Sequence, residues 1–326
     1  MSEAPNVPQV LSGFATIAIV IAIGFFVGKA NLLGKHAQFT LQMYVYFLAT
    51  PALLLDKLYV TDPLDVLGPQ LAVASGSALV IGLIYFLWVR TALHRPIHES
   101  AVGGLASSYC NASNLGIPVA AHVVGDSTVV VPTLLFQIAF YGPIVLAILD
   151  VVTAKEAHAD GRAGRVNTRS LFITPFKNPM LLGALTGLVI SILHSHAGVS
   201  VPHPIVEPIH LIGQSAVPVA LIAFGMSLAG QKVLDPSTSP KLEVGVASTT
   251  KIIGQPLAAF LIAHFVFGMT GHALFAACVV ATLPTAQNVY TYATRYGRGL
   301  ILARDAGVIT TAASFVMIML LALVFT

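Results

Sequence analysis

ASSYCNASNLGIP, residues 106–118, is a polar stretch in the middle of an apolar segment long enough to span a bilayer. Pro118 lacks a backbone donor and crowds the preceding turn, and Gly116 gives the backbone extra freedom. Backbone groups freed at membrane depth are tolerated only where they are buried in protein or line a wet cavity. The stretch therefore predicts a broken membrane helix whose half-helix ends meet near the bilayer midplane, where they can bind an ion or an anionic substrate.

A second interruption of the same kind lies far downstream, at ATLPTAQNVY, residues 281–290. Here Pro284, small residues and the amide pair Gln287 and Asn288 break another apolar segment. Two interrupted spans, one in each half of a chain, are typical of the binding sites of inverted-repeat transporters. The two stretches together predict a transporter.

The composition is that of an all-α, polytopic membrane protein. Of the 326 residues, 56% are hydrophobic and only 9% are charged, against about 25% charged residues in soluble domains. A soluble core of this length has no use for so much apolar surface, so most of it must face lipid or other helices. Both cysteines, Cys110 and Cys278, fall in apolar segments, which argues against a disulfide framework or a zinc site. We expect no cofactor.

The apolar segments predict about ten membrane spans. They are expected near residues 10–27, 39–55, 71–89, 101–124, 129–152, 180–193, 209–228, 244–267, 273–292 and 300–325. A polar loop over residues 154–176 separates a first unit, residues 1–153, from a second unit, residues 177–326. Because each unit holds an odd number of spans, five, the two units have opposite orientations, which defines an inverted repeat. Pro51 and Pro218, each in the second span of its unit, agree with this repeat.

The basic residues predict the orientation in the membrane. Fourteen of the 16 lysines and arginines follow odd-numbered spans, the exceptions being Lys57 and Lys251. Because basic residues concentrate in cytoplasmic loops, the odd-numbered connections are expected in the cytoplasm and both termini outside a cell (inner) membrane. The basic central loop belongs to this pattern and is not interpreted as a nucleic-acid site.

Three motifs resemble the auxin efflux carrier family: NASNLGIP at residues 111–118, TKIIGQP at 250–256 and LPTAQNV at 283–289. The resemblance covers essentially the whole chain. It implies a fold like that of the bile-acid/sodium symporters, with a scaffold of spans one, two, six and seven and a transport domain of spans three to five and eight to ten. Broken spans four and nine would cross at the substrate site. The resemblance also implies an elevator-type carrier of small organic anions, either auxin-like acids or dicarboxylates such as malate and malonate. We expect the apolar scaffold to form a homodimer.

The expected substrate-binding residues come from the two interruptions. They are Asn111, Asn114, Gln287, Asn288 and Tyr290, with Asn114 and Asn288 as the preferred pair. A side-chain amide offers donors and an acceptor, so it can hold a carboxylate or complete a broken helix end. The alternative is hydrogen bonding between helices without ligand contact.

Three further residues, Gly116, Pro118 and Pro284, are expected to set the helix breaks. The alternative is a kink without a binding role. Gln137 and Tyr141 are candidates for the cavity lining, although membrane helices also use such residues for packing.

Lys251 is the only basic residue deep in a span, and intramembrane charges usually face a cavity and serve function. Its ammonium could substitute for a coupling cation, attract the anion directly or carry a coupled proton. The alternatives are a structural salt bridge, for which Asp56 and Asp150 are candidate partners, or a side chain that reaches the interface.

No catalytic or metal site is expected. The chain has no Gly-x-Ser-x-Gly elbow, His-Glu-x-x-His pair or Gly-x-x-x-x-Gly-Lys-[Ser/Thr] phosphate loop. Among the histidines expected on the outer side, His194-x-His196 is the only compact spacing. The main alternative function is a sodium-coupled organic-anion symporter of the bile-acid type, which Lys251 disfavours because a fixed cation competes with Na⁺. An intramembrane enzyme and a channel or sensor are alternatives from other classes.

Overall fold

The computed structural model describes residues 7–159, 177–198, 201–229 and 239–325, and within these ranges every regular element is helical. In the first unit the elements are α1 (Val7–Lys29), α2 (Ala37–Tyr44), η1 (Val45–Ala49), α3 (Thr50–Leu58), α4 (Pro63–Leu67), α5 (Pro69–Ala92), α6 (Ile97–Ala106), η2 (Ala112–Gly116), α7 (Ile117–Val119), η3 (Ala120–Val124), η4 (Ser127–Val130), α8 (Val131–Phe136), η5 (Gln137–Tyr141) and α9 (Gly142–Ala159). In the second they are α11 (Pro179–Ala197), α12 (His203–Gln214), α13 (Ala216–Leu228), α14 (Lys241–Thr249), η7 (Thr250–Gly254), α15 (Gln255–Leu261), η8 (Ile262–Val266), α16 (Gly271–Thr282), α17 (Gln287–Tyr296) and α18 (Leu300–Phe325).

Among the described residues, seven helical segments are long and apolar enough to cross a membrane. They are Ala37–Leu58, Pro69–Ala92, Ser127–Ala154, Pro179–Ala197, His203–Leu228, Lys241–Val266 and Leu300–Phe325. Three shorter apolar helices, Ala15–Lys29, Ala112–Val124 and Gly271–Thr282, occupy parts of the expected first, fourth and ninth spans. The chain is thus a multi-pass helical membrane protein, whereas ten spans in an inverted repeat stays a prediction.

The expected central loop begins later than the sequence predicts. α9 continues to Ala159, so its last turns extend into the range expected to be loop. The remainder of the expected loop, residues 160–176, lies outside the described residues.

Proline explains an irregularity that recurs along the long helices. Four π-helical turns, η1, η2, η5 and η7, each end two residues before a proline: Pro51, Pro118, Pro143 and Pro256. A proline has no N–H to donate and its ring crowds the preceding turn, so the helix there widens instead of ending. The helical segments therefore continue through these prolines.

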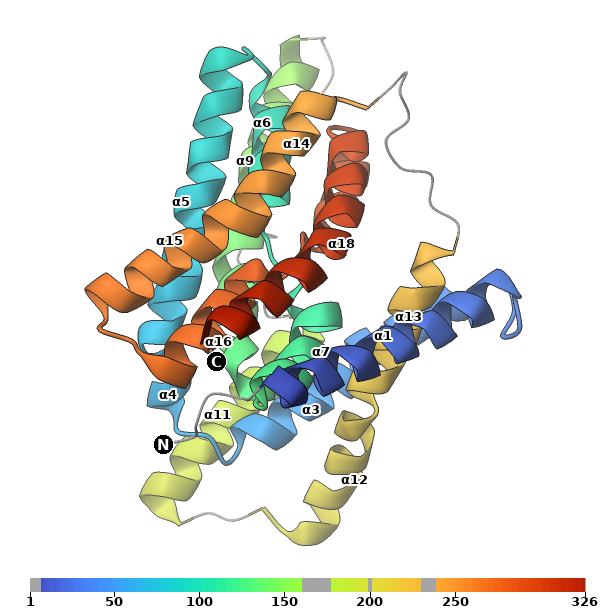
Figure 1. The fold of residues 1–326 in the computed structure, drawn as a ribbon, viewed down its shortest axis with the longest axis vertical. Helices are drawn as coiled ribbons and strands as arrows, with labels where there is room; N and C mark the ends of the chain where they lie inside the picture. The colour runs from blue at the N-terminus through green and yellow to red at the C-terminus, as the bar shows by residue number, and fades with distance from the viewer. Residues whose placement is uncertain (1–6, 160–176, 199–200, 230–238, 326) are drawn as a thin grey trace.

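The helices divide into two groups that pack mainly among themselves (Figure 1). In the first group, α1 packs along α13, and α3 packs against α11 and α12. Glycines permit these close approaches: a Cβ at Gly28 would lie 2.8 Å from Met226 Cα, and one at Gly183 would lie 2.5 Å from the Pro51 carbonyl oxygen. Close backbone approach at small residues is how membrane helices associate tightly.

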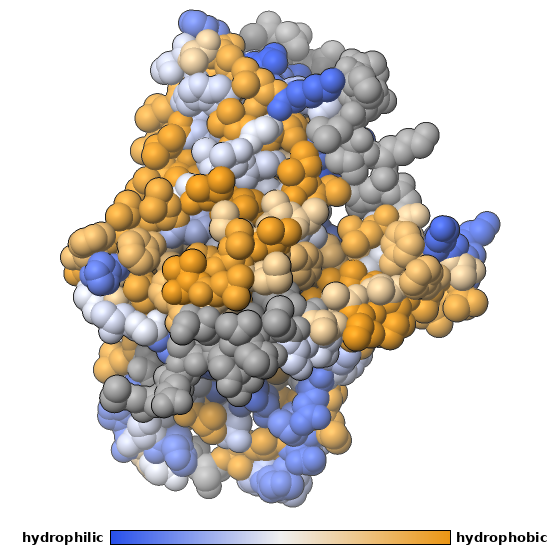
Figure 2. Space-filling model, viewed as in Figure 1, coloured by the Kyte–Doolittle hydropathy of each residue, from blue (hydrophilic) through white to orange (hydrophobic). Residues whose placement is uncertain are grey.

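The second group consists of α5, α6, α8, α9, α14, α15, α16, α17 and α18, most of which are labelled in Figure 1. Its core combines aromatic and small side chains, among them Tyr85, Tyr109, Ala106 and Ala247. On the face in Figure 2, apolar residues cover the middle of the molecule and hydrophilic residues gather mainly towards its upper and lower ends, as expected for a protein surrounded by lipid.

Candidate functional site

The two interrupted segments meet each other. The N–H of Asn111 donates to the Pro284 carbonyl at 2.7 Å, and the N–H of Ala286 donates to the Tyr109 carbonyl at 3.0 Å. Cys110 and Thr285, which lie between these hydrogen-bonded residues, form an isolated antiparallel bridge. We call these six residues, 109–111 and 284–286, the junction. Two extended segments thus satisfy each other's backbone groups within a helical protein.

Side chains complete the hydrogen bonding of the junction. The Thr285 hydroxyl donates to the carbonyl of Ala106, the last residue of α6, at 2.5 Å, and the Thr285 N–H donates to Thr310 Oγ1 of α18 at 3.0 Å. With its amide oxygen oriented towards the Cys110 N–H, the Gln137 side chain accepts from that N–H at 2.6 Å. Its amide nitrogen then donates to the Cys110 carbonyl at 3.0 Å. The sequence offered Gln137 as a cavity residue; the structure gives it this structural role, although it also lines the smaller cavity described below.

Two half-helices begin at the junction. One runs from Ala112 to Val124 and the other, α17, from Gln287 to Tyr296. The first N–H groups of a helix have no partner within the helix, and its N-terminus carries partial positive charge. The junction therefore gathers two helix ends of the kind that binds anions.

The Lys251 side chain lies behind the junction and is fully buried. Its Nζ donates to the Ala281 carbonyl at 2.9 Å and to Cys110 Sγ at 3.4 Å. Ala281 is in the last turn of α16, where carbonyl groups lack helical partners and the helix dipole favours a cation. The ammonium thus caps a half-helix at the site of the break.

No acidic residue in the described parts of the chain pairs with Lys251. Of the two acidic candidates, Asp56 Oδ2 lies 3.0 Å from His210 Nδ1, and Asp150 Oδ1 accepts from the Tyr296 hydroxyl at 2.6 Å. The salt-bridge alternative with these two residues is therefore wrong, and so is a side chain that reaches the interface, because none of it is exposed.

Two cavities flank the junction, with volumes of about 170 Å³ and 640 Å³. Both are lined by Gln42, Asn111, Ala286, Gln287 and Thr291. Each also has walls from the first helix group: Tyr46 and Met180 in the smaller cavity, Phe224 and Ser227 in the larger one. The cavities therefore lie between the two helix groups. Among the described residues that line them, none is acidic.

The expected substrate residues all reach these cavities. Asn114 and Asn288 line only the smaller one, Tyr290 only the larger one, and Asn111 and Gln287 line both. Gln287 connects the group, because its Oε1 accepts from Asn114 Nδ2 at 3.4 Å and from Gln42 Nε2 at 3.2 Å. The hydrogen bond of Asn114 therefore goes to Gln287 and not to Asn288, with which the sequence analysis had paired it.

The helix-break residues are placed differently from one another. Pro284 lies in the second break, between α16 and α17. Gly116 and Pro118, in contrast, follow the first break, which covers residues 107–111, and lie inside the half-helix that begins at Ala112. Gly116 instead allows close packing across the junction, since a Cβ there would lie 2.8 Å from Leu283 Cδ1. The unwound backbone coincides with the run from residue 107 to residue 111. Its two serine hydroxyls bond to the Gly104 carbonyl, and the Asn111 N–H bonds to Pro284 in span nine.

Several lining residues were not identified from the sequence, and two of them, Gln42 and Arg304, matter most here. Gln42, in the expected second span, bonds to Gln287 at the start of α17, and Arg304, counted only as a loop charge, lines the larger cavity. A signal for Gln42 was present, because it is an amide within an apolar segment. Nothing in the sequence pattern indicated which face of α18 Arg304 occupies.

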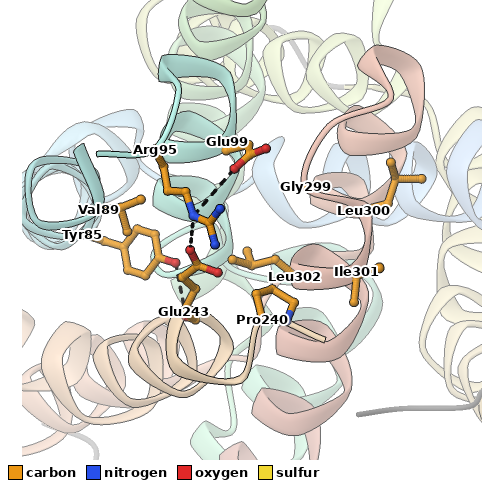
Figure 3. Close-up of a pocket in the computed structure, with 10 residues that line it drawn as sticks. All are labelled: Tyr85, Val89, Arg95, Glu99, Pro240, Glu243, Gly299, Leu300, Ile301 and Leu302. Carbon is orange, nitrogen blue, oxygen red and sulfur yellow. Dashed lines mark hydrogen bonds and ion pairs between the residues drawn. The ribbon is translucent and has the colours of Figure 1, made fainter. Parts of the chain in front are cut away.

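A separate pocket of about 330 Å³ lies among the ends of α5, α6, α14 and α18 (Figure 3). Arg95 Nε is 2.6 Å from Glu243 Oε1 and 4.0 Å from Glu99 Oε2, and the Tyr85 hydroxyl donates to the Glu243 carbonyl. The hydrogen bond to Glu243 and its negative charge raise the pKa of Arg95. This ion pair ties the connection between α5 and α6 to α14, and none of the expected site residues lines the pocket.

The described residues contain no group of three His, Cys, Asp or Glu side chains that could hold a metal ion.

Comparison with known proteins gives the family context. Residues 10–323 match the family described as membrane transport protein. A protein of Rhizobium meliloti named "Putative malonate transporter" is 24% identical over 282 residues, which cover 85% of this chain and 84% of that protein. A protein of Methanothermobacter thermautotrophicus named "Uncharacterized transporter" is 26% identical over 201 residues, which cover 57% of this chain and 63% of that protein.

Proposed function

The chain belongs to the membrane transport protein family of auxin efflux carrier type, and we propose that it is a secondary active carrier of small organic anions. The substrate class we favour is the short dicarboxylates. A relative that covers most of the chain carries malonate in its name, which supports this choice over auxin-like acids.

The observation that carries the proposal is the junction with its two flanking cavities. A membrane carrier needs a polar site within the bilayer that is shielded from lipid, and broken helices at an interface provide it. Here the amides of Asn111, Gln287 and Asn288 face cavities between two helix groups. We assign substrate binding to these amides together with Asn114 and Tyr290.

Charge supports an anion over a cation as the substrate. The half-helix N-termini at Ala112 and Gln287 contribute partial positive charge, and the buried Lys251 ammonium lies 3.4 Å from the thiol of Cys110 in the junction. The described lining residues of both cavities include no carboxylate to repel an anion.

The packing supports alternating access by movement of one helix group against the other. We propose that the first group, with its close glycine contacts, is the scaffold and that the second group carries the junction as the transport domain. Both cavities lie between the groups, so a displacement of the second group would change the side from which they open. The amide bond from Gln42 to Gln287 would break and re-form during this movement.

For coupling, we propose that the Lys251 ammonium takes the place of a cation at the junction. A sodium-coupled mechanism is the second candidate function. The fixed charge beside Cys110 and Ala281 opposes it, because Na⁺ would have to bind next to a buried ammonium.

A thermal-shift screen of carboxylates on the purified protein tests the proposed binding, since a ligand specific for the folded state raises its melting temperature by mass action. We expect malonate or another short dicarboxylate to stabilise the wild-type protein. Asn288→Ala should weaken that ligand roughly ten- to hundredfold, because hydrogen bonds to charged groups contribute about 1.5–3 kcal/mol.

The matched control is Gln214→Ala, which removes an amide that bonds to His210 and lines neither cavity. It should bind like the wild type. If no organic anion stabilises the wild-type protein, or if Asn288→Ala binds as tightly as Gln214→Ala, binding at the junction is refuted.

A further inference from the structure

Arg304 is the only charged side chain among the described residues that line the larger cavity. It shares one face of α18 with Gly307, Val308 and Thr311, which also line that cavity and follow it at helical spacing. The same helix supplies Thr310, whose hydroxyl accepts from the junction. Thr310 lies six positions after Arg304, or about 9 Å along the helix axis.

The structure holds the Arg304 guanidinium in place from one side. Its Nε donates to Asp305 Oδ1 at 2.8 Å, and the second carboxylate oxygen of Asp305 accepts from the Ser239 hydroxyl at 2.7 Å. The Asp305 side chain is fully buried. Both of its oxygens are therefore in use, and Arg304 is anchored by a carboxylate that does not itself enter the cavity.

The other side of the guanidinium remains available. Within the described part of the chain, neither Nη group of Arg304 donates a hydrogen bond, and 31% of the side chain is exposed. A planar guanidinium with two parallel N–H groups matches the geometry of a carboxylate, and bidentate pairs of this kind are among the stronger hydrogen bonds in proteins. Anchoring through Nε reduces the side-chain entropy lost when such a pair forms.

The cavity between Arg304 and the junction is open along α18. A Cβ at Gly307 would meet no atom within 4 Å. The long arginine side chain and the carbon chain of a substrate can together span the distance to the junction. The amides at the junction are neutral, so a carboxylate bound there leaves a second carboxylate of the same molecule without a counter-charge unless Arg304 supplies it.

We propose that Arg304 binds the second carboxylate of a dicarboxylate substrate and that this contact selects dicarboxylates over monocarboxylates. The inference rests on the proposed function, because it assumes that the first carboxylate is held at the junction. Asp305 is the positioning residue: it fixes Nε and leaves both Nη groups directed to the ligand.

The test compares succinate with butyrate, which has the same number of carbons and one carboxylate fewer. Binding of both is measured by isothermal titration calorimetry on the full-length purified wild type, Arg304→Gln and Arg304→Lys. The wild type should bind succinate at least tenfold more tightly than butyrate. Arg304→Gln should lose roughly ten- to hundredfold in succinate affinity while its butyrate affinity stays within about twofold.

Arg304→Lys retains the charge but lacks the fork, so its succinate affinity should fall between those of the other two proteins. It also serves as the second variant should Arg304→Gln fail to fold. Equal losses for succinate and butyrate, or no loss for either, in a variant with the melting temperature of the wild type would overturn the role of Arg304.

These outcomes separate the two proposals. In one outcome the wild type binds succinate, Asn288→Ala weakens that binding, and Arg304→Gln and Arg304→Lys do not change it. This outcome supports the proposed function and refutes the role of Arg304. A wild-type protein that binds neither acid, and is not stabilised by malonate, overturns both.

Discussion

Replacing Lys251 by methionine removes a buried positive charge that lies behind the junction, and it keeps an unbranched side chain of similar length. In the wild type the ammonium donates to the Ala281 carbonyl and to Cys110 Sγ, and it is fully buried. The substitution therefore separates two roles of this residue, the capping of α16 and the attraction of an anion.

The effect on anion affinity follows from Coulomb's law. Nζ lies 3.4 Å from the sulfur of Cys110, whose chain neighbour Asn111 lines both cavities. One residue of chain adds about 4 Å, so the ammonium is roughly 8 Å from a carboxylate at the junction. At an effective dielectric constant of about 20, two unit charges at that distance attract by about 2 kcal/mol, or about thirtyfold in affinity.

The effect on stability should be smaller, because two terms oppose each other. The Ala281 carbonyl loses its partner, which costs about 1–3 kcal/mol. Removing a buried ammonium also removes its desolvation penalty, which is several kcal/mol for an ion in a protein interior. The ligand-free variant should therefore lose no more than about 2 kcal/mol in free energy of unfolding.

Calorimetric titration with malonate and a thermal melt of the same samples measure both effects. Lys241→Met is the matched control, because Lys241 is an exposed lysine at the start of α14. Affinity unchanged in Lys251→Met would leave this residue a helix cap only. Wild-type transport that stops when choline replaces Na⁺ would refute the idea that the ammonium takes the place of a coupling cation.

Three further predictions test the mechanism, the packing and the orientation. Cysteines at Met43 and Ser113, which both line the smaller cavity, should allow a bifunctional crosslinker to tie α2 to the half-helix and stop transport reversibly; full turnover of the crosslinked carrier would argue for local gating instead. Gly24→Ala should lower the free energy of unfolding by about 1–3 kcal/mol, because the new Cβ would collide with α13. The control variant Gly245→Ala, at a position with open space around it, should melt like the wild type. His94→Cys, exposed between α5 and α6, should resist an impermeant maleimide in intact cells and react in inverted vesicles; labelling from outside would reverse the assigned orientation.

The sequence located the two breaks because polar residues and proline are conspicuous in apolar spans. Pro284 lies in its break, since a residue before proline favours an extended backbone and Leu283 adopts one, with φ −54° and ψ 144°. Pro118 was misread for a physical reason: a proline inside a well-packed helix can widen one turn without ending the helix.

Long-range partners were beyond the sequence. That Lys251 meets the carbonyl of Ala281 depends on how span eight packs against α16, and no local pattern encodes this packing. The same holds for Gln42 and Arg304, whose function depends on the helix face that turns towards the junction. Composition and periodicity indicate which residues avoid lipid, whereas tertiary packing decides which of them meet.

Uptake of labelled malonate into proteoliposomes tests the central claim most directly. The account predicts saturable uptake by the wild-type protein, competition by excess unlabelled malonate and strongly reduced uptake by Asn288→Ala at the same protein density. Uptake no greater than in protein-free liposomes for every short dicarboxylate and auxin-like acid tried, or flux that rises linearly without saturation, would contradict a carrier with its anion site at the junction.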